Sequence, residues 1–400
     1  MGAAMFDPAR HAAVTATPWD PGQVQHAIQA IVADAEASFD PIRFWPAHPL
    51  DQHVPDGSTG LYFGAAGVIW AMEFLKQEGG AEHGLDFAPI LPKLLQANRS
   101  EFTAIATQSG IEPQRCSYLF GDAPILLMLL PEQAPADQLF NRIEGSLRLP
   151  VLELMWGAAG TMIACAIAHA RTGEDRWRTL YLAQAARLLA GLDQTEFGPV
   201  WNQDLYGRVQ RYLGPVHGYA GNMRALLAGW DWLTEAGRTR IREVVLATLS
   251  ANAVHSDDGV NWKPIASADP APPLVQHCHG APGMVTSLAD PRLASPELVV
   301  LLEGGGRLTW RAGPLAKGSN VCHGTGGNGF AFLKLHALTG ETEWLDHARA
   351  FAMTAIEQWR SATAEYGRGR YSLWTGDIGL ALYLHECLAG TARFPTIDVF

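Results

Sequence analysis

A short glycine motif returns seven times along this chain and constrains its fold more than any other feature. The copies begin at Gly64, Gly121, Gly157, Gly218, Gly280, Gly324 and Gly376. Each copy precedes an apolar stretch that is long enough for a helix, such as residues 68–75 (VIWAMEFL) and 161–168 (TMIACAIA). A helix that is hydrophobic on nearly all sides is a buried helix. The motif therefore predicts seven buried helices that begin in the same way.

Amphipathic segments alternate with these apolar stretches. The clearest are Arg176–Leu192, Arg238–Val254 and Glu341–Arg360, and they predict outer, half-exposed helices. Buried helices that alternate with outer ones indicate an all-α fold, an α/α toroid (barrel) of seven helical hairpins with the glycine motifs at the starts of the inner helices. Open solenoids such as HEAT arrays also alternate helices, but their repeats are more even and lack paired glycines at one class of helix.

We expect a single toroid domain over residues 1–400, in which 1–58 form a lead-in with the first outer helix and 59–400 hold the repeats. Glycine at a helix start near a crowded centre permits unusual backbone angles and close approach of neighbouring chains. The helix starts are expected to gather at one end of the ring and to present unpaired N–H groups to an anion or thiolate there. Asp122 and Asp377, which follow two of the first glycines, are predicted to cap their helices.

Composition and charge exclude several other classes of protein. With 48% hydrophobic and 17% charged residues, the chain is not disordered. A net charge of −11 without a Lys/Arg cluster disfavours nucleic acid and anionic membranes as partners. The sequence has no secretory signal and no apolar run of about 18 residues, so a cytoplasmic protein is expected. Five cysteines, an odd number, argue against a disulfide framework and favour a metal ligand or a nucleophile.

The tripeptide Cys-His-Gly occurs twice, each time at the same phase of the repeat. Composition alone predicts about 0.02 copies in a chain like this one. If equivalent positions of neighbouring repeats converge on the centre, then Cys278, Cys322 and His323 reach one point. Two thiolates and one imidazole are a three-ligand set for zinc that leaves a position open for water or substrate, as in catalytic sites. The alternative is that both cysteines are ordinary buried thiols.

Three further residues are candidates for proton transfer. His217 occupies the histidine position of the motif in the fourth repeat, where its neutral form is favoured, and the alternative is a core histidine. His279 either lines the pocket, hydrogen-bonds a ligand or takes the open metal position. Glu153 lies four residues before Gly157 and can hold a histidine's proton or take one itself, or else is a solvated loop residue.

With these residues the chain resembles the lanthionine synthetase C-like (LanC-like) family. Within that family it resembles the stand-alone members, which are similar to the eukaryotic glutathione-binding branch, more than it resembles the fused lanthipeptide synthetases. The matching segments are Phe120–Pro124 (FGDAP), Glu153–Gly160 (ELMWGAAG), His217–Gly221 (HGYAG), Val275–Gly283 (VQHCHGAPG), Lys317–Asn328 (KGSNVCHGTGGN) and Ala392–Pro395 (ARFP). The resemblance extends from about residue 62 to the C-terminus. It implies an α/α toroid with a central zinc ion, Zn²⁺, held by Cys278, Cys322 and His323.

The resemblance also implies a reaction. Zinc would activate the thiol of cysteine or glutathione for a Michael-type addition to dehydroalanine or dehydrobutyrine in a peptide or protein, which forms a thioether. His217 matches the family's acid/base histidine, and Glu153 falls where the cyclases carry an aspartate. Lys317 matches a lysine of the stand-alone branch and would pair with a carboxylate of glutathione. His277 and Ala158 depart from that branch, which has tryptophan and arginine there.

Several functions stay open at this point. The enzyme would add a small thiol to another molecule, or it would act as a lanthipeptide cyclase within one peptide. In both cases a separate dehydratase or kinase/lyase is expected to supply the dehydroamino acid, because the first repeat begins by about residue 62. A non-catalytic zinc- or glutathione-binding scaffold is the alternative from another class. A carbohydrate-active toroid would need two facing carboxylates and gives the paired Cys-His-Gly no role.

Overall fold

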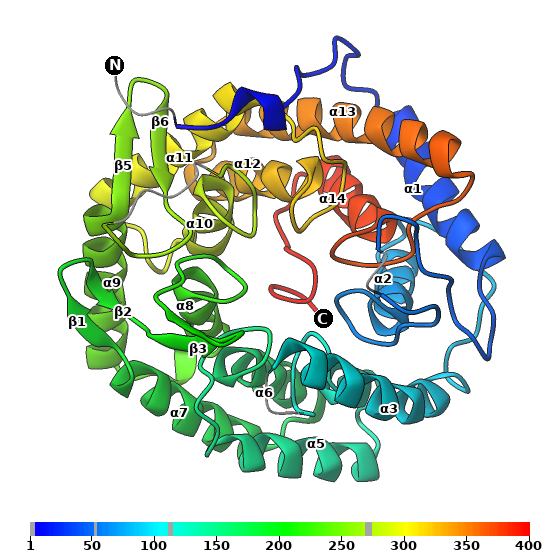
Figure 1. The fold of residues 1–400 in the computed structure, drawn as a ribbon, viewed down its shortest axis with the longest axis horizontal. Helices are drawn as coiled ribbons and strands as arrows, with labels where there is room; N and C mark the ends of the chain where they lie inside the picture. The colour runs from blue at the N-terminus through cyan, green and yellow to red at the C-terminus, as the bar shows by residue number, and fades with distance from the viewer. Residues whose placement is uncertain (1–4, 52–53, 111–114, 269–273) are drawn as a thin grey trace.

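The computed structural model describes residues 5–51, 54–110, 115–268 and 274–400. Within this part of the chain, two concentric rings of helices surround a common centre (Figure 1). The inner ring comprises α2 (Ala65–Gln77), α4 (Ala123–Met128), α6 (Ala158–Thr172), α8 (Tyr219–Ala228), α10 (Ala281–Leu288), α12 (Thr325–Thr339) and α14 (Asp377–Ala389). The outer ring comprises α1 (Pro21–Ala37), α3 (Leu91–Ser109), α5 (Gln133–Ser146), α7 (Asp175–Ala190), α9 (Glu235–Asn252), α11 (Pro296–Ala312) and α13 (Thr342–Tyr366).

The inner ring is closed. Each inner helix contacts the next one along the chain, and α14 contacts α2. The outer helix α1, near the N-terminus, packs against α14 and so serves as the outer partner of the last inner helix. The predicted all-α toroid is therefore confirmed, and a helix from one end of the sequence completes the hairpin at the other end.

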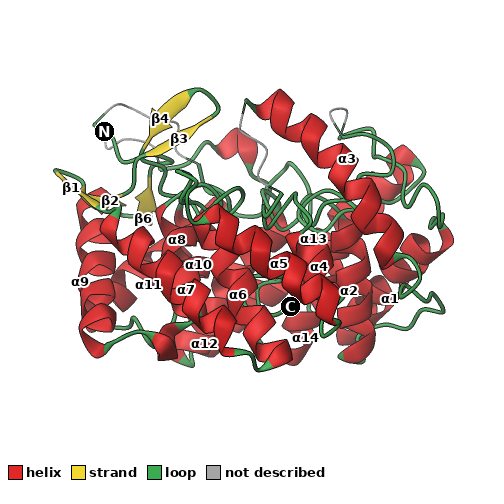
Figure 2. Ribbon diagram, turned by 90° about the horizontal axis from the view of Figure 1, so that it is seen from below, coloured by secondary structure: helices red, strands yellow, loops and turns green. Residues whose placement is uncertain are grey.

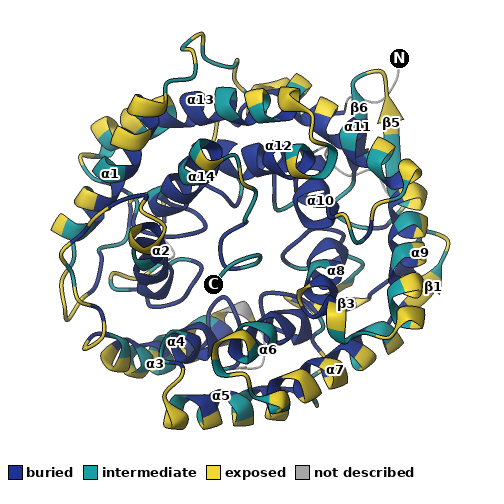
Figure 3. Cartoon of the chain, turned by 180° about the vertical axis from the view of Figure 1, so that it is seen from behind, coloured by how far each residue is buried: buried dark blue, intermediate teal, exposed yellow. Residues whose placement is uncertain are grey.

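Burial follows the two rings. Each of the seven inner helices is buried along most of its length, whereas the outer helices expose one face (Figure 3). In α10 every residue is buried, while in α9 only five are, at the spacing of an amphipathic helix. The buried apolar side chains form one continuous cluster that fills the space between the rings.

Short β-hairpins interrupt the helical pattern. The antiparallel pairs are β1 (Asp193–Thr195) with β2 (Gly198–Val200), β3 (Gln203–Leu205) with β4 (Arg208–Gln210), and β5 (Ala253–Ser256) with β6 (Gly259–Trp262). The sequence does not predict these hairpins, because strands of three or four residues are too short to show an alternating pattern. β3 and β4 lie on the side of the toroid where the loops gather, as does α3 (Figure 2).

The expectation that the inner helices present unpaired N–H groups to the centre is wrong. Their N–H groups do not face the centre unpaired, because the loops before most of these helices supply carbonyl acceptors. The N–H of Ala65 donates to the carbonyl of Ser58 at 2.8 Å, and the N–H of Tyr219 donates to that of Tyr212 at 3.0 Å. At six of the helix starts the preceding loop thus caps the helix with a backbone carbonyl, whereas at α10 the N–H of Ala281 donates to Oδ1 of Asn261 at 2.9 Å. The helix ends are not an open anion site.

The same loops explain why glycine occurs at the helix starts. The close approach of the loop to the glycine matters more than the backbone angle of the glycine. Most of the first glycines have extended backbone angles that any residue adopts, such as Gly218 at φ −149°. A Cβ there would lie 2.1 Å from the carbonyl oxygen of Tyr212. Of the seven first glycines only Gly280 has a positive φ, at 109°. Glycine is therefore required because the folded-over loop leaves no room for a side chain.

The two aspartates do not cap their helices, so that prediction is wrong. Asp122 makes no cap hydrogen bond and instead forms ion pairs with Arg99 of α3 and Arg142 of α5. The carboxylate of Asp377 accepts the N–H of Arg370, in the loop before α14. Both acids therefore attach an inner helix start to segments around it.

Among the described residues, no helix is long and apolar enough to span a membrane.

The role of the glycines can be tested with a matched pair of substitutions. In Gly221→Ala the new Cβ would lie 1.9 Å from the carbonyl oxygen of Pro215, and we expect a loss of about 3 kcal/mol in the free energy of unfolding. In Gly145→Ala, inside α5, the Cβ meets no atom within 4 Å, and alanine should stabilise the helix by about 0.5–1 kcal/mol. Denaturant unfolding measures both. Equal effects would contradict the close-approach explanation.

Candidate metal centre and active site

Backbone hydrogen bonds link the loops at the centre of the ring. They join the residues two positions before the first glycine of successive repeats. The N–H of Cys278 donates to the carbonyl of Cys322 at 3.1 Å, and the N–H of Cys322 donates to that of Trp374 at 2.9 Å. The N–H of Trp374 donates in turn to Tyr62 at 3.2 Å, whose own N–H donates to Leu119 at 3.0 Å. Equivalent positions of five repeats are therefore adjacent in space.

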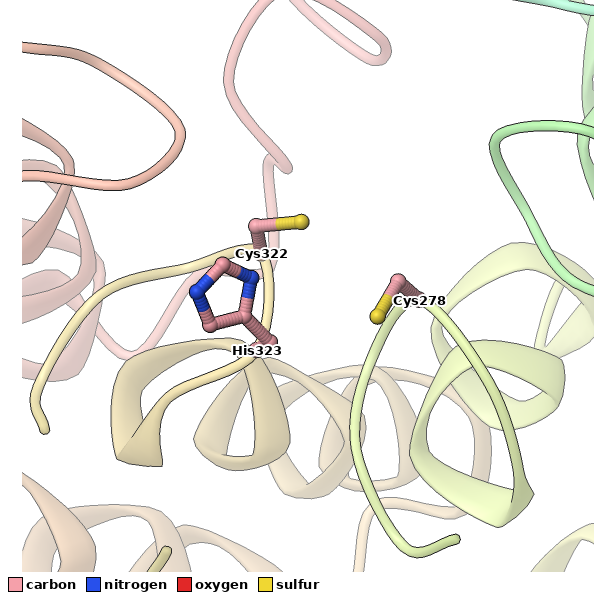
Figure 4. A group of neighbouring side chains, drawn as sticks. All are labelled: Cys278, Cys322 and His323. Carbon is pink, nitrogen blue, oxygen red and sulfur yellow. The ribbon is translucent and has the colours of Figure 1, made fainter. Parts of the chain in front are cut away.

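This register brings two thiols and an imidazole together. Cys278 lies in the loop before α10, and Cys322 and His323 lie in the loop before α12 (Figure 4). One ligand atom from each of the three residues lies within 4.8 Å of the other two. Among the described residues, no other group of three or more Cys, His, Asp and Glu side chains is placed to hold a metal ion.

Polar neighbours hold the two sulfur atoms. The hydroxyl of Tyr62 lies 2.7 Å from Sγ of Cys322. Nε2 of Gln276 donates to Sγ of Cys278 at 2.9 Å, and Nη2 of Arg10 donates to Oε1 of Gln276 at 3.0 Å. Arg10 comes from the segment before α1, so the N-terminal region reaches the centre as well. These contacts fix both thiol positions from outside the motif.

The protonation of the cluster suits a divalent cation. Burial lowers the pKa of His323 to about 4, so its imidazole is neutral at pH 7 and has a free lone pair. A hydrogen bond from the Cys322 thiol, and a second one from Gln276, lower the pKa of Cys278. The same hydrogen bond and burial raise the pKa of Cys322. Two sulfur ligands and a neutral imidazole nitrogen are donors that zinc prefers, so the residues present fit this metal.

Glu153 and His217 form a second group. The Glu153 side chain has no exposed surface, and its Oε2 accepts the N–H of Met155 at 3.1 Å and Nδ1 of His217 at 2.8 Å. The interpretation of Glu153 as a solvated loop residue is therefore wrong. A carboxylate only accepts hydrogen bonds, so Nδ1 of His217 carries its proton in the neutral ring and Nε2 is the free nitrogen. The imidazole itself is 21% exposed.

Tyr206 lies over the free nitrogen of His217. Its hydroxyl is 3.3 Å from Nε2 of His217 and accepts a hydrogen bond from Nε1 of Trp156 at 3.0 Å. Tyr206 and Gly207 form the two-residue turn between β3 and β4, with φ values of 57° and 72°. Positive φ at both positions defines a type I′ turn, whose twist matches that of a hairpin. The turn thus holds an aromatic hydroxyl over the imidazole.

The remaining histidines of the motif have different surroundings. Burial, and to a smaller extent the nearby His217, lower the pKa of His279 to about 4. Its Nδ1 is buried without a hydrogen-bond partner, and His279 is not part of the metal-ligand cluster. The side chain of His277 packs against the C-terminal segment. Its ring stacks on Phe394 at 4.5 Å between centroids, and burial lowers its pKa to about 3.

Positive charge lies on one side of the cluster. Lys317 is exposed, and its charge contributes to lowering the pKa values of Cys278 and His323 and opposes the rise in the pKa of Cys322. Arg370 also contributes to lowering the pKa of His323, although its guanidinium pairs with Asp51. A ligand with negative groups would meet favourable charge on this side of the centre.

Sequence reasoning missed four residues around the site: Arg10, Tyr62, Gln276 and Tyr206. Tyr62 and Gln276 were accessible in principle, since Tyr62 shares the register of Cys322 and Gln276 precedes the Cys-His-Gly motif by two residues. Arg10 and Tyr206 belong to no repeat. They reach the centre through the N-terminal segment and the β3–β4 turn, which only the folded chain reveals.

These observations define a class of protein, an α/α toroid with a Cys₂His cluster at its centre and a histidine–glutamate pair in the same region. The family model described as Lanthionine synthetase C-like protein matches residues 24–399. The chain therefore belongs to this family, as its motifs had indicated.

Individual relatives agree with this assignment. Glutathione S-transferase LANCL1 from Danio rerio is 25% identical over 305 residues, which cover 71% of this chain and 74% of that protein. LanC-like protein GCL1 from Arabidopsis thaliana is 31% identical over 144 residues, or 34% of this chain and 33% of that relative. Among solved structures, nisin cyclase matches with a TM-score of 0.58 and 14% identity, covering 91% of this chain and 94% of its own. That likeness shows the shared fold.

The exposure of the five cysteines makes the cluster testable. Cys278 is half-buried, whereas the other four are buried. In the presence of a chelator we expect iodoacetamide to label Cys278 first, because only its sulfur belongs to a partly accessible residue. Added zinc should slow this labelling by occupying the thiol. Peptide mass spectrometry follows the rate at each cysteine, with the buried Cys165 as the internal control. Equal labelling of Cys278 with and without zinc would contradict the ligand assignment.

Proposed function

We propose that the protein is a zinc-dependent enzyme that forms thioethers by adding a thiol to dehydroalanine or dehydrobutyrine in a peptide or protein. The observation that carries the proposal is the cluster of Cys278, Cys322 and His323 beside the His217–Glu153 pair. A metal-ligand set with only three members leaves a coordination position for substrate. A neutral histidine held by a buried carboxylate is suited to move a proton. Thioether formation needs both functions.

Cys278, Cys322 and His323 would hold the zinc ion. When bound there, zinc lowers the pKa of a coordinated substrate thiol and supplies a thiolate at neutral pH. Gln276 and Tyr62 hold the two cysteine sulfurs in place by hydrogen bonds, and Arg10 orients Gln276. This chain therefore contributes a pre-organised set of donors, which is what fast binding and correct geometry require.

His217 would carry the proton. Addition of sulfur to the β-carbon of the dehydroamino acid leaves negative charge on the α-carbon and its carbonyl, and the α-carbon must then take up a proton. Nε2 would take up the proton that the substrate thiol loses and then deliver it to the α-carbon, while Glu153 accepts from Nδ1 and stabilises the protonated imidazole in between. Tyr206 must turn away or pass the proton on, because its hydroxyl covers Nε2. His279, whose pKa is lowered mainly by burial and to a smaller extent by the nearby His217, is proposed to assist this transfer.

The thiol is proposed to be glutathione or a cysteine. Lys317 lies on the positively charged side of the centre and would bind a carboxylate of glutathione. A relative that covers 71% of this chain carries glutathione transfer in its name, which favours this thiol. A separate dehydratase or kinase/lyase would make the dehydroamino acid. All five cysteines are free, as expected for the reducing cytoplasm in which we propose that the protein acts.

Metal analysis tests the ligand set. The wild-type protein should contain about one zinc ion per chain, and Cys322→Ala should contain none after dialysis, because only one thiolate and one imidazole remain. Cys165→Ala is the matched control, since Cys165 is a buried cysteine outside the cluster. Absence of zinc from the wild type after purification and zinc addition would refute the assignment. Zinc without any thiol addition would instead favour a non-catalytic scaffold.

A second experiment tests proton transfer. His217→Gln should lower kcat for glutathione addition to a dehydroalanine peptide by about 10²–10⁴-fold, the usual contribution of a positioned acid or base. Zinc content should stay unchanged, because His217 is outside the ligand cluster. His26→Gln, at an exposed position of α1, is the control. Mass spectrometry of the product separates this addition from cyclisation of a cysteine-containing peptide. Full activity of His217→Gln would remove His217 from the mechanism.

A further inference from the structure

A cleft opens next to the candidate active site and has no role in the chemistry described so far. It has an empty volume of about 780 Å³ and lies between the loop before α2, helix α3 and the β3–β4 turn. Its apolar wall is formed by Phe63, Ile105, Phe120, Met155 and Trp156. Figure 2 shows α3 and the β3–β4 hairpin on the loop side of the toroid, where a peptide could approach.

The cleft is continuous with the reaction centre. Tyr62 and His217 both line it. The hydroxyl of Tyr62 lies 2.7 Å from Sγ of Cys322, one of the proposed zinc ligands, and Nε2 of His217 is the proposed proton donor. A molecule in the cleft would therefore reach both the activated thiol and the acid. Continuity with both groups indicates that part of a substrate occupies this space.

The charge distribution indicates which substrate it is. None of the described residues that line the cleft is Lys, Arg, Asp or Glu. Lys317 and Arg370, the positively charged residues near the cluster, do not line the cleft. A thiol with carboxylates, such as glutathione, is therefore favoured on the charged side of the cluster. The uncharged cleft is left for the other reactant, the dehydroamino acid and its neighbours.

The wall of the cleft is made of packed rings. Phe120 stacks on Trp156 with ring centroids 5.0 Å apart and an interplanar angle of 18°. Phe63 meets Tyr62 edge to face at 4.5 Å. Rings held by other rings form a surface that does not need to rearrange, and pockets of this kind bind apolar groups by removing their surface from water. Against these rings a charged or hydroxylated side chain would lose hydration without gaining hydrogen bonds from the rings, and no charged residue among the described lining would compensate a charge.

We propose that this cleft binds an aliphatic or aromatic side chain of the acceptor peptide, one or two residues away from the dehydroamino acid. Each residue of an extended peptide advances the chain by about 3.3 Å, so such a side chain is within reach of the cleft while the reacting carbon faces the thiol. The cleft then determines acceptor specificity. This proposal rests on the proposed thioether-forming function and adds the class of peptide on which it acts.

The test compares two dehydroalanine peptides that differ only in the residues flanking dehydroalanine, leucine in one and serine in the other. With glutathione as the thiol, kcat/KM should be at least about 10-fold higher for the leucine peptide, the usual discrimination by a hydrophobic pocket. Ile105→Glu should abolish this preference, because it places a charge in the apolar wall. Thr107→Glu, an exposed position of the same helix that does not line the cleft, should keep it.

A binding measurement separates failure of this inference from failure of the proposed function. Calorimetry with unreactive peptides, in which alanine replaces dehydroalanine, needs no turnover. Tighter binding of the leucine peptide to the wild type than to Ile105→Glu supports the cleft even if no thioether forms. Equal binding of the leucine and serine peptides to the wild type, or equal kcat/KM values where turnover occurs, would overturn the proposal.

Discussion

The hydrogen bonds between neighbouring loops are the constraint on which the rest of this structure depends. They pair the same position of successive repeats, so Cys278 is bonded through its backbone to Cys322, and Cys322 to Trp374. In the five repeats joined in this way the residues at that position are adjacent, and the side chains of Cys278 and Cys322 meet. The metal-ligand cluster thus needs no motif in which the ligands are close in sequence. It needs only that two neighbouring repeats carry cysteine at the paired position and that histidine follows one of them.

The glycines serve the same arrangement. At every inner helix except α10 the preceding loop folds back over the helix start, so that a loop carbonyl accepts an N–H there. A side chain at Gly218 would collide with such a loop. The helix starts are therefore satisfied by the chain itself, and their positive ends are not available to a ligand. The electrostatics of the centre come instead from side chains, namely Lys317 and the hydrogen bonds to the two sulfurs.

Sequence reasoning predicted those parts of the site that repeat. The toroid follows from the recurrence of the glycine motif, and the proximity of Cys278, Cys322 and His323 follows from their equivalent positions in two repeats. Both patterns can be read from the sequence alone. The free helix starts and the capping role of Asp122 were wrong, because local propensity does not show which tertiary partner a group finds. Tyr206 was invisible for another reason. It comes from a hairpin of three-residue strands outside the repeats, and no pattern in the sequence points from that turn to His217.

The pairing of α1 with α14 has a consequence for the order in which the molecule is made. A ribosome releases the chain from its N-terminus, so α1 must wait without its partner until almost the whole polypeptide has emerged. The carbonyl of Trp374 that holds Cys322 emerges at nearly the same time. The nascent chain therefore has both cysteines before it has a closed ring around them, and during this interval the centre stays open. Contacts between residues so distant in sequence are slow to form, which lengthens the interval.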